Sequence, residues 1–146
     1  MRVISGSAKG KKLISSKSRE IRPTSDKVKM AIFNILRHGV INFDFNGCYT
    51  LDLFSGSGSL GIESLSRGSE FCFFLDISHG SHQVCKKNLQ SCGFTHISAN
   101  IIWDIRKKKP FFVENKFDLI LADPPYGSEH PKNILEFVKK NDLLKA

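Results

Sequence analysis

From Cys48 onward, short apolar runs alternate with amphipathic stretches, and this alternation limits the fold more than any other feature of the chain. The apolar runs are Tyr49 to Phe54, Phe71 to Leu75, Ile97 to Trp103 and Phe117 to Ala122. Such runs predict strands of a parallel sheet, and the stretches between them predict helices, two of which stop at Gly68 and Gly93. The sequence therefore predicts an α/β fold with a mostly parallel sheet.

The first forty residues follow a different pattern. Two short apolar stretches surround Gly6 to Gly10, which predicts a hairpin with a loose basic loop within residues 2–15. Thr24 or Ser25 then offers a helix start, and apolar residues recur at helical spacing before Gly39. We expect a basic hairpin and helix in front of the sheet.

The positive charge of the chain is concentrated in this N-terminal part. The net charge is +8 over 146 residues. Residues 1–40 hold ten Lys or Arg and two acids, whereas the remaining 106 residues hold twelve of each. A concentrated basic segment is typical of a surface that neutralises nucleic-acid phosphates. A solvated, flexible basic tail explains the charge equally well.

A glycine pattern follows the first predicted strand. Gly56, Gly58 and Gly61 form Gly-x-Gly-x-x-Gly between a predicted strand and a predicted helix, and Asp76 comes twenty residues after Gly56. The glycines let the backbone turn sharply and approach a nucleoside, and the acid at the end of the second strand can accept hydrogen bonds from both ribose hydroxyls. The pattern predicts a site for a nucleoside cofactor, although it can also be a turn that only connects strand and helix.

Asp52 distinguishes between possible cofactors. It lies at the end of the first strand, four residues before Gly56, where a carboxylate suits a cationic amino-acid tail. S-adenosylmethionine has such a tail and has no pyrophosphate. We therefore predict S-adenosylmethionine as the cofactor; the residues predicted to bind it are Asp52, Phe54, Gly56, Ser57, Gly58, Asp76 and Asp104.

The most specific motif is Asp123-Pro124-Pro125-Tyr126, which ends the last apolar strand at the edge where open α/β sheets bind ligands. The exocyclic amino group of a base is a poor nucleophile, so a catalyst must hold and aim its nitrogen. Asp123 can accept one amino hydrogen, the carbonyl of Pro124 can accept the other, and Tyr126 can stack on the base. These three are the predicted catalytic residues, unless the motif is only a rigid turn.

Two further signals lie between the glycine pattern and Asp123. Asp104 follows Trp103 at the end of the third strand, where the carboxylate could accept from the adenine amino group and the indole could flank the ring; a solvent-exposed Asp after a core Trp is the alternative. His79 and His82 form a His-x-x-His without a suitably spaced third ligand, so we expect helix-surface histidines and no metal.

Cysteine spacing and hydropathy bear on the compartment. The four cysteines form no Cys-x-x-Cys pair, which favours reduced core residues. No apolar stretch has the length of a signal peptide or of a membrane span. We expect a cytoplasmic protein that binds no membrane.

Together these motifs resemble one family. The chain is similar to the bacterial methyltransferases that modify a guanine N2 in 16S ribosomal RNA. The resemblance covers essentially the whole chain, because beyond the motifs above it includes Gly6, Lys9-Gly10-Lys11, Arg22-Pro23-Thr24-Ser25-Asp26, Ala31 to Leu36 and Glu63 to Gly68. Met30 and Asp76 depart from it, since the family usually has Glu at both positions.

The resemblance implies a Rossmann-like class I methyltransferase fold that uses S-adenosylmethionine to methylate a guanine N2 of 16S rRNA in an assembling small subunit. It implies an RNA-binding extension over residues 1–40 and a cofactor-binding domain over residues 41–146. The residues expected to contact the substrate are Arg2, Lys9, Lys11, Arg22, Thr24 and Tyr126. The motif chemistry leaves an adenine N6 methyltransferase open, and a non-catalytic RNA-binding relic is a further alternative. An NAD-dependent oxidoreductase would leave Asp123 to Tyr126 unexplained.

The family fold also has three further strands, whereas after Tyr126 this sequence predicts only one more helix, Pro131 to Lys140. We therefore expect a domain that is incomplete at its C-terminus, with its fourth strand exposed as an edge. Such a chain should be less stable, oligomeric or assisted by a partner; the sequence does not fix its oligomeric state.

Overall fold

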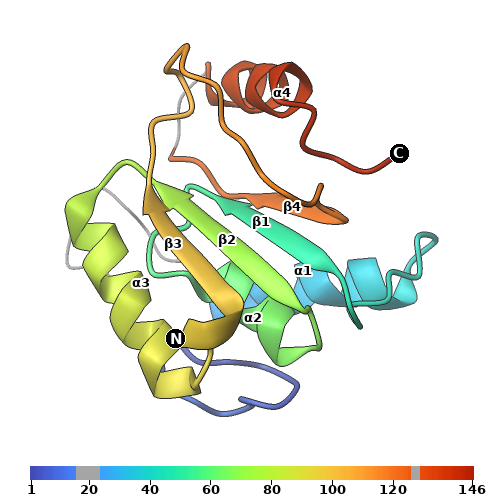
Figure 1. Cartoon of the computed structure of the whole chain (residues 1–146). Helices are drawn as coiled ribbons and strands as arrows, with labels where there is room; N and C mark the ends of the chain where they lie inside the picture. The colour runs from blue at the N-terminus through green and yellow to red at the C-terminus, as the bar shows by residue number, and fades with distance from the viewer. Residues whose placement is uncertain (16–23, 126–128) are drawn as a thin grey trace.

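The computed structural model describes residues 1–15, 24–125 and 129–146. Its centre is a four-stranded parallel sheet in the order β3-β2-β1-β4 (Figure 1). The strands are β1 (Tyr49–Leu53), β2 (Phe71–Asp76), β3 (Ser98–Ile102) and β4 (Leu119–Ala122). The four predicted strands are confirmed, each within two residues of its predicted ends.

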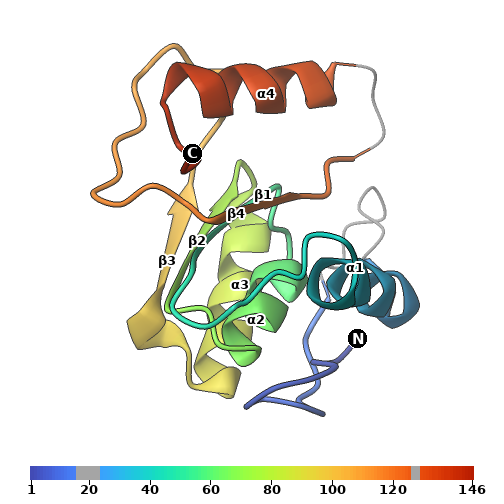
Figure 2. The same cartoon turned by 90° about the vertical axis from the view of Figure 1, so that its right-hand side faces the viewer.

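Helices cover both faces of this sheet. They are α1 (Asp26–His38), α2 (Ser59–Ser66), α3 (His79–Cys92) and α4 (His130–Lys140), with a 3-10 turn η1 (Thr95–Ile97). Figure 2 shows α4 on one side of the sheet and α1, α2 and α3 on the other. The chain therefore folds as the predicted α/β architecture, in three layers.

Local sequence signals set the helix ends. The Ser25 side chain caps α1 by accepting from the Val28 N–H, and Ser78 caps α3 by accepting from the Ser81 N–H. Gly93 ends α3 in the left-handed conformation, with φ 74°. The predicted helix start at Thr24 or Ser25 is confirmed, with Ser25 as the cap.

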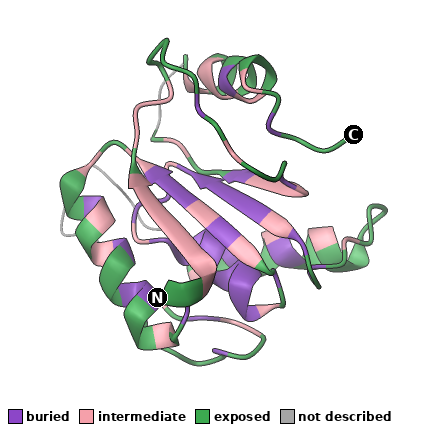
Figure 3. Cartoon of the chain, viewed as in Figure 1, coloured by how far each residue is buried: buried purple, intermediate pink, exposed green. Residues whose placement is uncertain are grey.

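The two faces of the sheet carry separate apolar clusters. Alternate residues of β2 divide between them: Cys72 and Phe74 pack with α2 and α3, whereas Leu75 packs on the α4 side with Phe137. Figure 3 shows the buried residues concentrated in β1, β2 and α2. All eight residues of α2 are buried. This helix begins directly after the glycine loop, so the loop is attached to the most buried helix of the fold.

Residues 1–15 pack against this core as an ordered segment. Arg2 and Lys12 form an antiparallel bridge, which confirms the predicted hairpin in its shortest form. Val3, Ala8 and Leu13 are buried in the cluster built by α2, α3 and β2. Residues 1–15 are therefore not a solvated tail, and the predicted loose loop is in fact packed. Whether residues 1–40 act as a separate RNA-binding unit stays a prediction.

The fourth strand lies at the edge of the sheet, as predicted. Among the described residues, Leu119–Ala122 pairs only with β1. The start of this edge is covered, because the Phe117 N–H donates to the Leu143 carbonyl and the Lys145 N–H donates to the Phe117 carbonyl, at 2.8 and 2.9 Å. The expected consequences of the exposed edge for stability and assembly stay predictions.

Candidate functional site

The three main motifs meet at one edge of the sheet. Leu53 is in register with Leu75 of β2 and with Ala122 of β4, so the carboxyl ends of these strands lie side by side. The glycine loop leaves β1 there, β2 ends there in Asp76, and Asp123 follows β4 directly. Open α/β sheets bind ligands at this edge.

The glycines of the loop have different physical roles. Gly56, with φ +54°, faces open space, because the nearest atom to an added Cβ would be 4.0 Å away. A Cβ on Gly58 would lie 2.7 Å from Cys85 Sγ, and one on Gly61 would lie 2.3 Å from Phe74 Cε1. Gly58 and Gly61 thus allow α2 to pack closely against β2 and α3, whereas Gly56 keeps one side of the loop accessible.

The residue before this loop has an unusual backbone. Phe54 has φ +55°, in the left-handed region that side chains other than glycine rarely adopt. Its ring packs edge-on against His130, the first residue of α4, with centroids 5.3 Å apart. Strained residues of this kind cluster at ligand sites, which agrees with the prediction that Phe54 borders the cofactor.

Asp76 joins the glycine loop to the end of β2. Its Oδ2 accepts from the Gly56 N–H and its Oδ1 accepts from the Ser78 N–H, both at 2.9 Å. A carboxylate offers about four acceptor positions, so about two remain for hydroxyl groups. The side chain is half-buried beside the open face of Gly56, and this geometry suits the predicted contact with a ribose.

Asp52 lies in the core beside the start of α2. It is 1% exposed, and its Oδ2 accepts from the Gly61 N–H at 2.9 Å, in the first turn of α2. The pKa of Asp52 is raised to about 8, chiefly by burial; the Gly61 hydrogen bond opposes this shift, and the charges of Asp76 and Asp123 contribute to it. Asp52 therefore holds α2 in place. Its predicted contact with a cationic tail stays a prediction.

The carboxylate of Asp104 is hydrogen-bonded to a residue of its own loop. Arg106 donates to the carboxylate of Asp104 through its backbone N–H, Nε and Nη2, at 2.9 to 3.0 Å. These hydrogen bonds, chiefly those of the Arg106 side chain, lower the pKa of Asp104. Trp103 packs edge-on against Phe111, with centroids 5.2 Å apart. The adenine of a bound cofactor could therefore bond to Asp104 only by competing with Arg106. The sequence motif did not indicate this competitor.

Asp123 is exposed and has a partner from the other end of the chain. Its Oδ2 accepts a hydrogen bond from Thr24 Oγ1, across 99 residues. The structure thus puts Thr24, which was predicted to contact the substrate, in direct contact with Asp123, which was predicted to be catalytic. Pro124 follows, half-buried. The predictions for Arg22 and Tyr126 lie outside the described residues.

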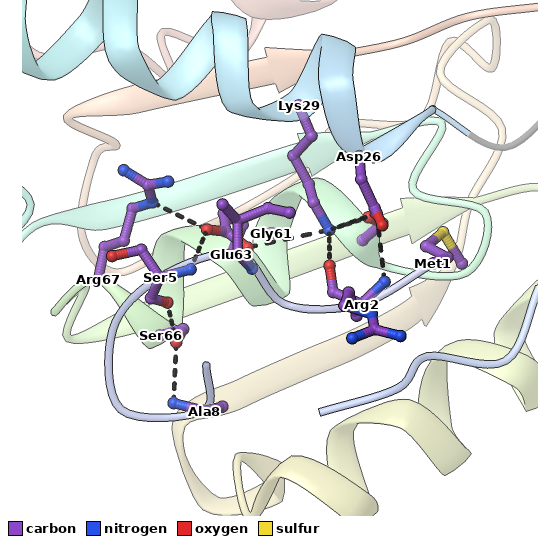
Figure 4. A network of polar contacts seen from close by, with 12 residues as sticks. Met1, Arg2, Ser5, Ala8, Asp26, Lys29, Gly61, Glu63, Ser66 and Arg67 are labelled. Carbon is purple, nitrogen blue, oxygen red and sulfur yellow. Dashed lines mark hydrogen bonds and ion pairs between the residues drawn. The ribbon is translucent and has the colours of Figure 1, made fainter. Parts of the chain in front are cut away.

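A buried ionic network ties the N-terminal segment and α1 to α2 (Figure 4). Lys29 Nζ donates to the Arg2 carbonyl at 2.7 Å and to Ser59 Oγ at 2.9 Å, and lies 3.9 Å from Glu63. Glu63 accepts from the backbone N–H groups of Ile4 and Ser5 and from Arg67 Nε; the side chains of Lys29 and Glu63 are both fully buried. Burial, opposed by the charges of Glu63 and Asp26, lowers the pKa of Lys29.

Sequence reasoning missed this network, because it counted Lys29 only as one of the basic residues of the N-terminal forty. The sequence does place Lys29 on the apolar face of α1, because Lys29 and Phe33 are four positions apart and so share one face of the helix. They are the two buried residues of this helix. Sequence alone shows no reason for a lysine on that face until its partner Glu63 is placed.

The predicted RNA-contact residues do not form one cluster. The Arg2 N–H donates to Asp26, near the start of α1. Lys9 and Lys11 are exposed, but Lys9 follows a turn in which Ser7 and Ala8 donate to Ser66, at the far end of α2 from the glycine loop. In the structure, Lys9 therefore lies away from Asp123, whereas Thr24 is hydrogen-bonded to Asp123.

A second basic surface was overlooked because charge was counted over long stretches. Residues 106–109 are Arg-Lys-Lys-Lys, all exposed, in the loop that leaves β3 at the carboxyl edge of the sheet. Phe111 anchors this loop by packing against Phe137 of α4, and neighbouring Phe112 is 88% exposed. A local charge window would have found this run.

A family model described as "Conserved hypothetical protein 95" matches residues 1–146. The chain is also 40% identical over 146 residues to YlbH of Bacillus subtilis, which is provisionally named an rRNA methyltransferase; the match covers 99% of this chain and 77% of that one. It is 32% identical to ribosomal RNA small subunit methyltransferase D of Haemophilus influenzae, over 99% of this chain and 74% of the relative. The chain belongs to this methyltransferase family.

Solved structures confirm the fold of this methyltransferase family for the chain. A methylase of Haemophilus influenzae, provisionally so named, superposes with a TM-score of 0.75 at 30% identity, over 99% of this chain and 75% of that one. A methyltransferase of Escherichia coli, also provisionally named, gives a TM-score of 0.79 at 24% identity with the same coverage. The predicted class I methyltransferase fold is therefore correct.

His82 Nε2 lies 3.0 Å from the Asn100 carbonyl, and within the described ranges no three His, Cys, Asp or Glu side chains gather as metal ligands would. The helices described include none that is both long and apolar enough to cross a bilayer. All four cysteines are free, three of them buried and Cys92 half-buried.

Proposed function

We propose that the chain transfers a methyl group from S-adenosylmethionine to the exocyclic N2 amino group of a guanine in 16S rRNA, as part of the small ribosomal subunit or its precursors. One observation carries the proposal: Asp76, the open glycine loop and Asp123 meet at one sheet edge in a member of a family whose relatives carry rRNA methyltransferase names. An enzyme with this substrate would act in the cytoplasm.

The loop fits a nucleoside with an amino-acid tail. Gly56 leaves open space at its Cα, and the Oγ of neighbouring Ser55 is buried with no hydrogen-bond partner among the described residues. Asp76 would hold the ribose, and Ser57 and Gly58 would border the tail through their backbone. When bound, S-adenosylmethionine supplies an electrophilic methyl group on a sulfonium.

Asp123 would orient the base. Its exposed carboxylate can accept one amino hydrogen, while the Pro124 carbonyl accepts the other and Tyr126 stacks on the ring. The Thr24 hydroxyl already donates to Asp123. This hydrogen bond to Oδ2 fixes the direction of the carboxylate and leaves Oδ1 for the substrate. The released proton can pass to Asp123 or to water.

RNA would be held by basic residues on two sides of this edge. Arg2 is hydrogen-bonded to Asp26 at the start of α1, and residues 106–109 follow β3. Exposed Phe112 beside this run adds a ring on which an unpaired base can stack. Lysines with an exposed aromatic neighbour are typical of RNA-binding loops, so the second surface supports RNA over a small-molecule substrate.

The test is methyl transfer from labelled S-adenosylmethionine to 16S rRNA and to small subunits that lack the modification, followed by mapping of the methylated base. Asp123→Asn should bind S-adenosylmethionine as the wild type does but lose transfer by about a hundredfold or more, in line with the loss of a group that orients and accepts in the reacting complex. Asp76→Asn should weaken cofactor binding instead. A wild-type chain that binds no S-adenosylmethionine in calorimetry would refute the proposal.

An adenine N6 methyltransferase is the second candidate, because Asp123 and Pro124 can orient either amino group. Label in N6-methyladenine would establish this alternative, and label in N2-methylguanine would exclude it. Retained RNA binding without cofactor binding would instead indicate a non-catalytic RNA-binding protein.

A further inference from the structure

Asn88 links three parts of the chain that are distant in sequence. It lies in α3 and is 1% exposed. Its Oδ1 accepts from the Ile14 N–H at 2.8 Å, and its Nδ2 donates to the Ile14 carbonyl and to the Ser57 carbonyl, both at 2.9 Å. One buried amide therefore joins the end of the N-terminal segment to the middle of the glycine loop.

The conformation of the glycine loop depends on a hydrogen bond from outside the loop. Ser57 lies between Gly56 and Gly58, which both have positive φ, and glycine moves between such conformations at little cost. Inside the loop, the Gly58 N–H donates to the Ser55 carbonyl, and Asp76 holds the Gly56 N–H. The Ser57 carbonyl is fixed by Asn88, so Asn88 sets the direction of the Ser57–Gly58 peptide.

Packing in the apolar core gives no reason for an asparagine at this position. Asparagine is a mediocre helix former, and a buried amide is costly unless its hydrogen bonds are made. The neighbouring buried residues of α3, Cys85 and Leu89, pack in the apolar cluster. A residue like them would serve the core equally well, so the amide is explained by the two backbone segments that it holds.

Both ends of the N-terminal segment reach the same loop. Ile14 reaches it through Asn88, and Met1 reaches it through its Sδ, which accepts from Ser57 Oγ at 3.8 Å. Lys29 adds a parallel link from the Arg2 carbonyl to Ser59, the first residue after the loop. Movement of the segment would therefore be transmitted to the loop.

We propose that Asn88 is a positioning residue that couples the N-terminal segment to the cofactor loop, so that order in the one maintains order in the other. The inference rests on the proposed function for the identity of the ligand, S-adenosylmethionine. A loop that is ordered before binding loses less conformational entropy when the ligand binds. The affinity for the cofactor should therefore depend on the hydrogen bonds of Asn88.

The experiment compares Asn88→Asp with Asn100→Asp. At position 88 the substitution keeps the acceptor for Ile14 but places an oxygen against two carbonyls. At position 100 it removes one amide donor, which bonds the His82 carbonyl at 2.9 Å, away from the loop. Asn88→Ala, which buries no charge, is the second variant in case Asn88→Asp does not fold. Hydrogen exchange of each chain without ligand, and calorimetric titration with S-adenosylmethionine, are the two measurements.

We expect faster exchange in residues 2–14 and 54–59 together for the Asn88 variants, and about tenfold weaker S-adenosylmethionine binding. The Asn100 control should change neither. Equal affinity and exchange in folded wild-type and Asn88 variants would overturn the inference, as would an equal loss in the control.

The wild-type chain provides a test that needs no variant. Saturating S-adenosylmethionine should slow exchange in residues 2–14 as well as in the loop, and protection confined to the loop would overturn the coupling. If the wild type binds no S-adenosylmethionine, the proposed function fails, and the coupling is then decided by the joint exchange change of the Asn88 variants alone.

Discussion

Replacing Asp52 by asparagine should make the stability of this protein less dependent on pH. The pKa of Asp52 is raised from its ordinary 3.8 to about 8, chiefly by burial. The folded chain therefore holds this proton more tightly than the unfolded chain does. The stabilisation from the protonated group is complete below about pH 4 and is lost as the pH rises through about 8.

The magnitude follows from this window. Each pH unit between the two pKa values costs the wild type about 1.4 kcal/mol. Near neutral pH, about three units above the ordinary value, the wild type has lost about 4 kcal/mol of its free energy of unfolding. The asparagine side chain cannot ionise, and its oxygen can still accept from the Gly61 N–H. The Asp52→Asn variant should therefore match the wild type in acid and exceed it at neutral pH.

The assay is urea unfolding of both chains at several pH values across this window. The difference between their free energies of unfolding isolates residue 52, because groups far from it contribute equally to both chains. Asp44→Asn, an exposed carboxylate changed in the same way, gives the baseline. A difference that stays constant with pH, or that grows toward acid, would refute the reasoning.

Three further outcomes are expected. Glu63→Gln should lower the free energy of unfolding by about 3–5 kcal/mol, because Lys29 is left buried without its counter-charge; urea unfolding checks this, and exposed Glu136→Gln should have no measurable effect. Gly61→Ala should cost about 1–3 kcal/mol, because its Cβ would lie 2.3 Å from Phe74, whereas Gly80→Ala in the exposed first turn of α3 should be neutral or stabilising in thermal unfolding. Alkylation of the native chain, followed by mass spectrometry, should label half-buried Cys92 before the buried thiols; equal labelling of Cys85 would contradict the packing of α3.

The motifs and their common location could be read from the sequence. Apolar runs separated by helical stretches fix a parallel sheet, and the carboxyl ends of parallel neighbours must meet at one edge. Asp76 and Asp123 each follow a run of this kind, so their convergence with the glycine loop required no further information. These features depend on periodicity and connection rules that act over short stretches of chain.

Only the tertiary structure decided which polar groups find each other. Lys29 is buried because Glu63 lies opposite, Asp123 meets Thr24 across 99 residues, and Asn88 holds Ser57 and Ile14. A buried polar side chain is stable only when a partner satisfies it, and that partner is set by packing between distant segments. Local sequence carries the pattern of burial, whereas these pairings exist only once the layers have been assembled.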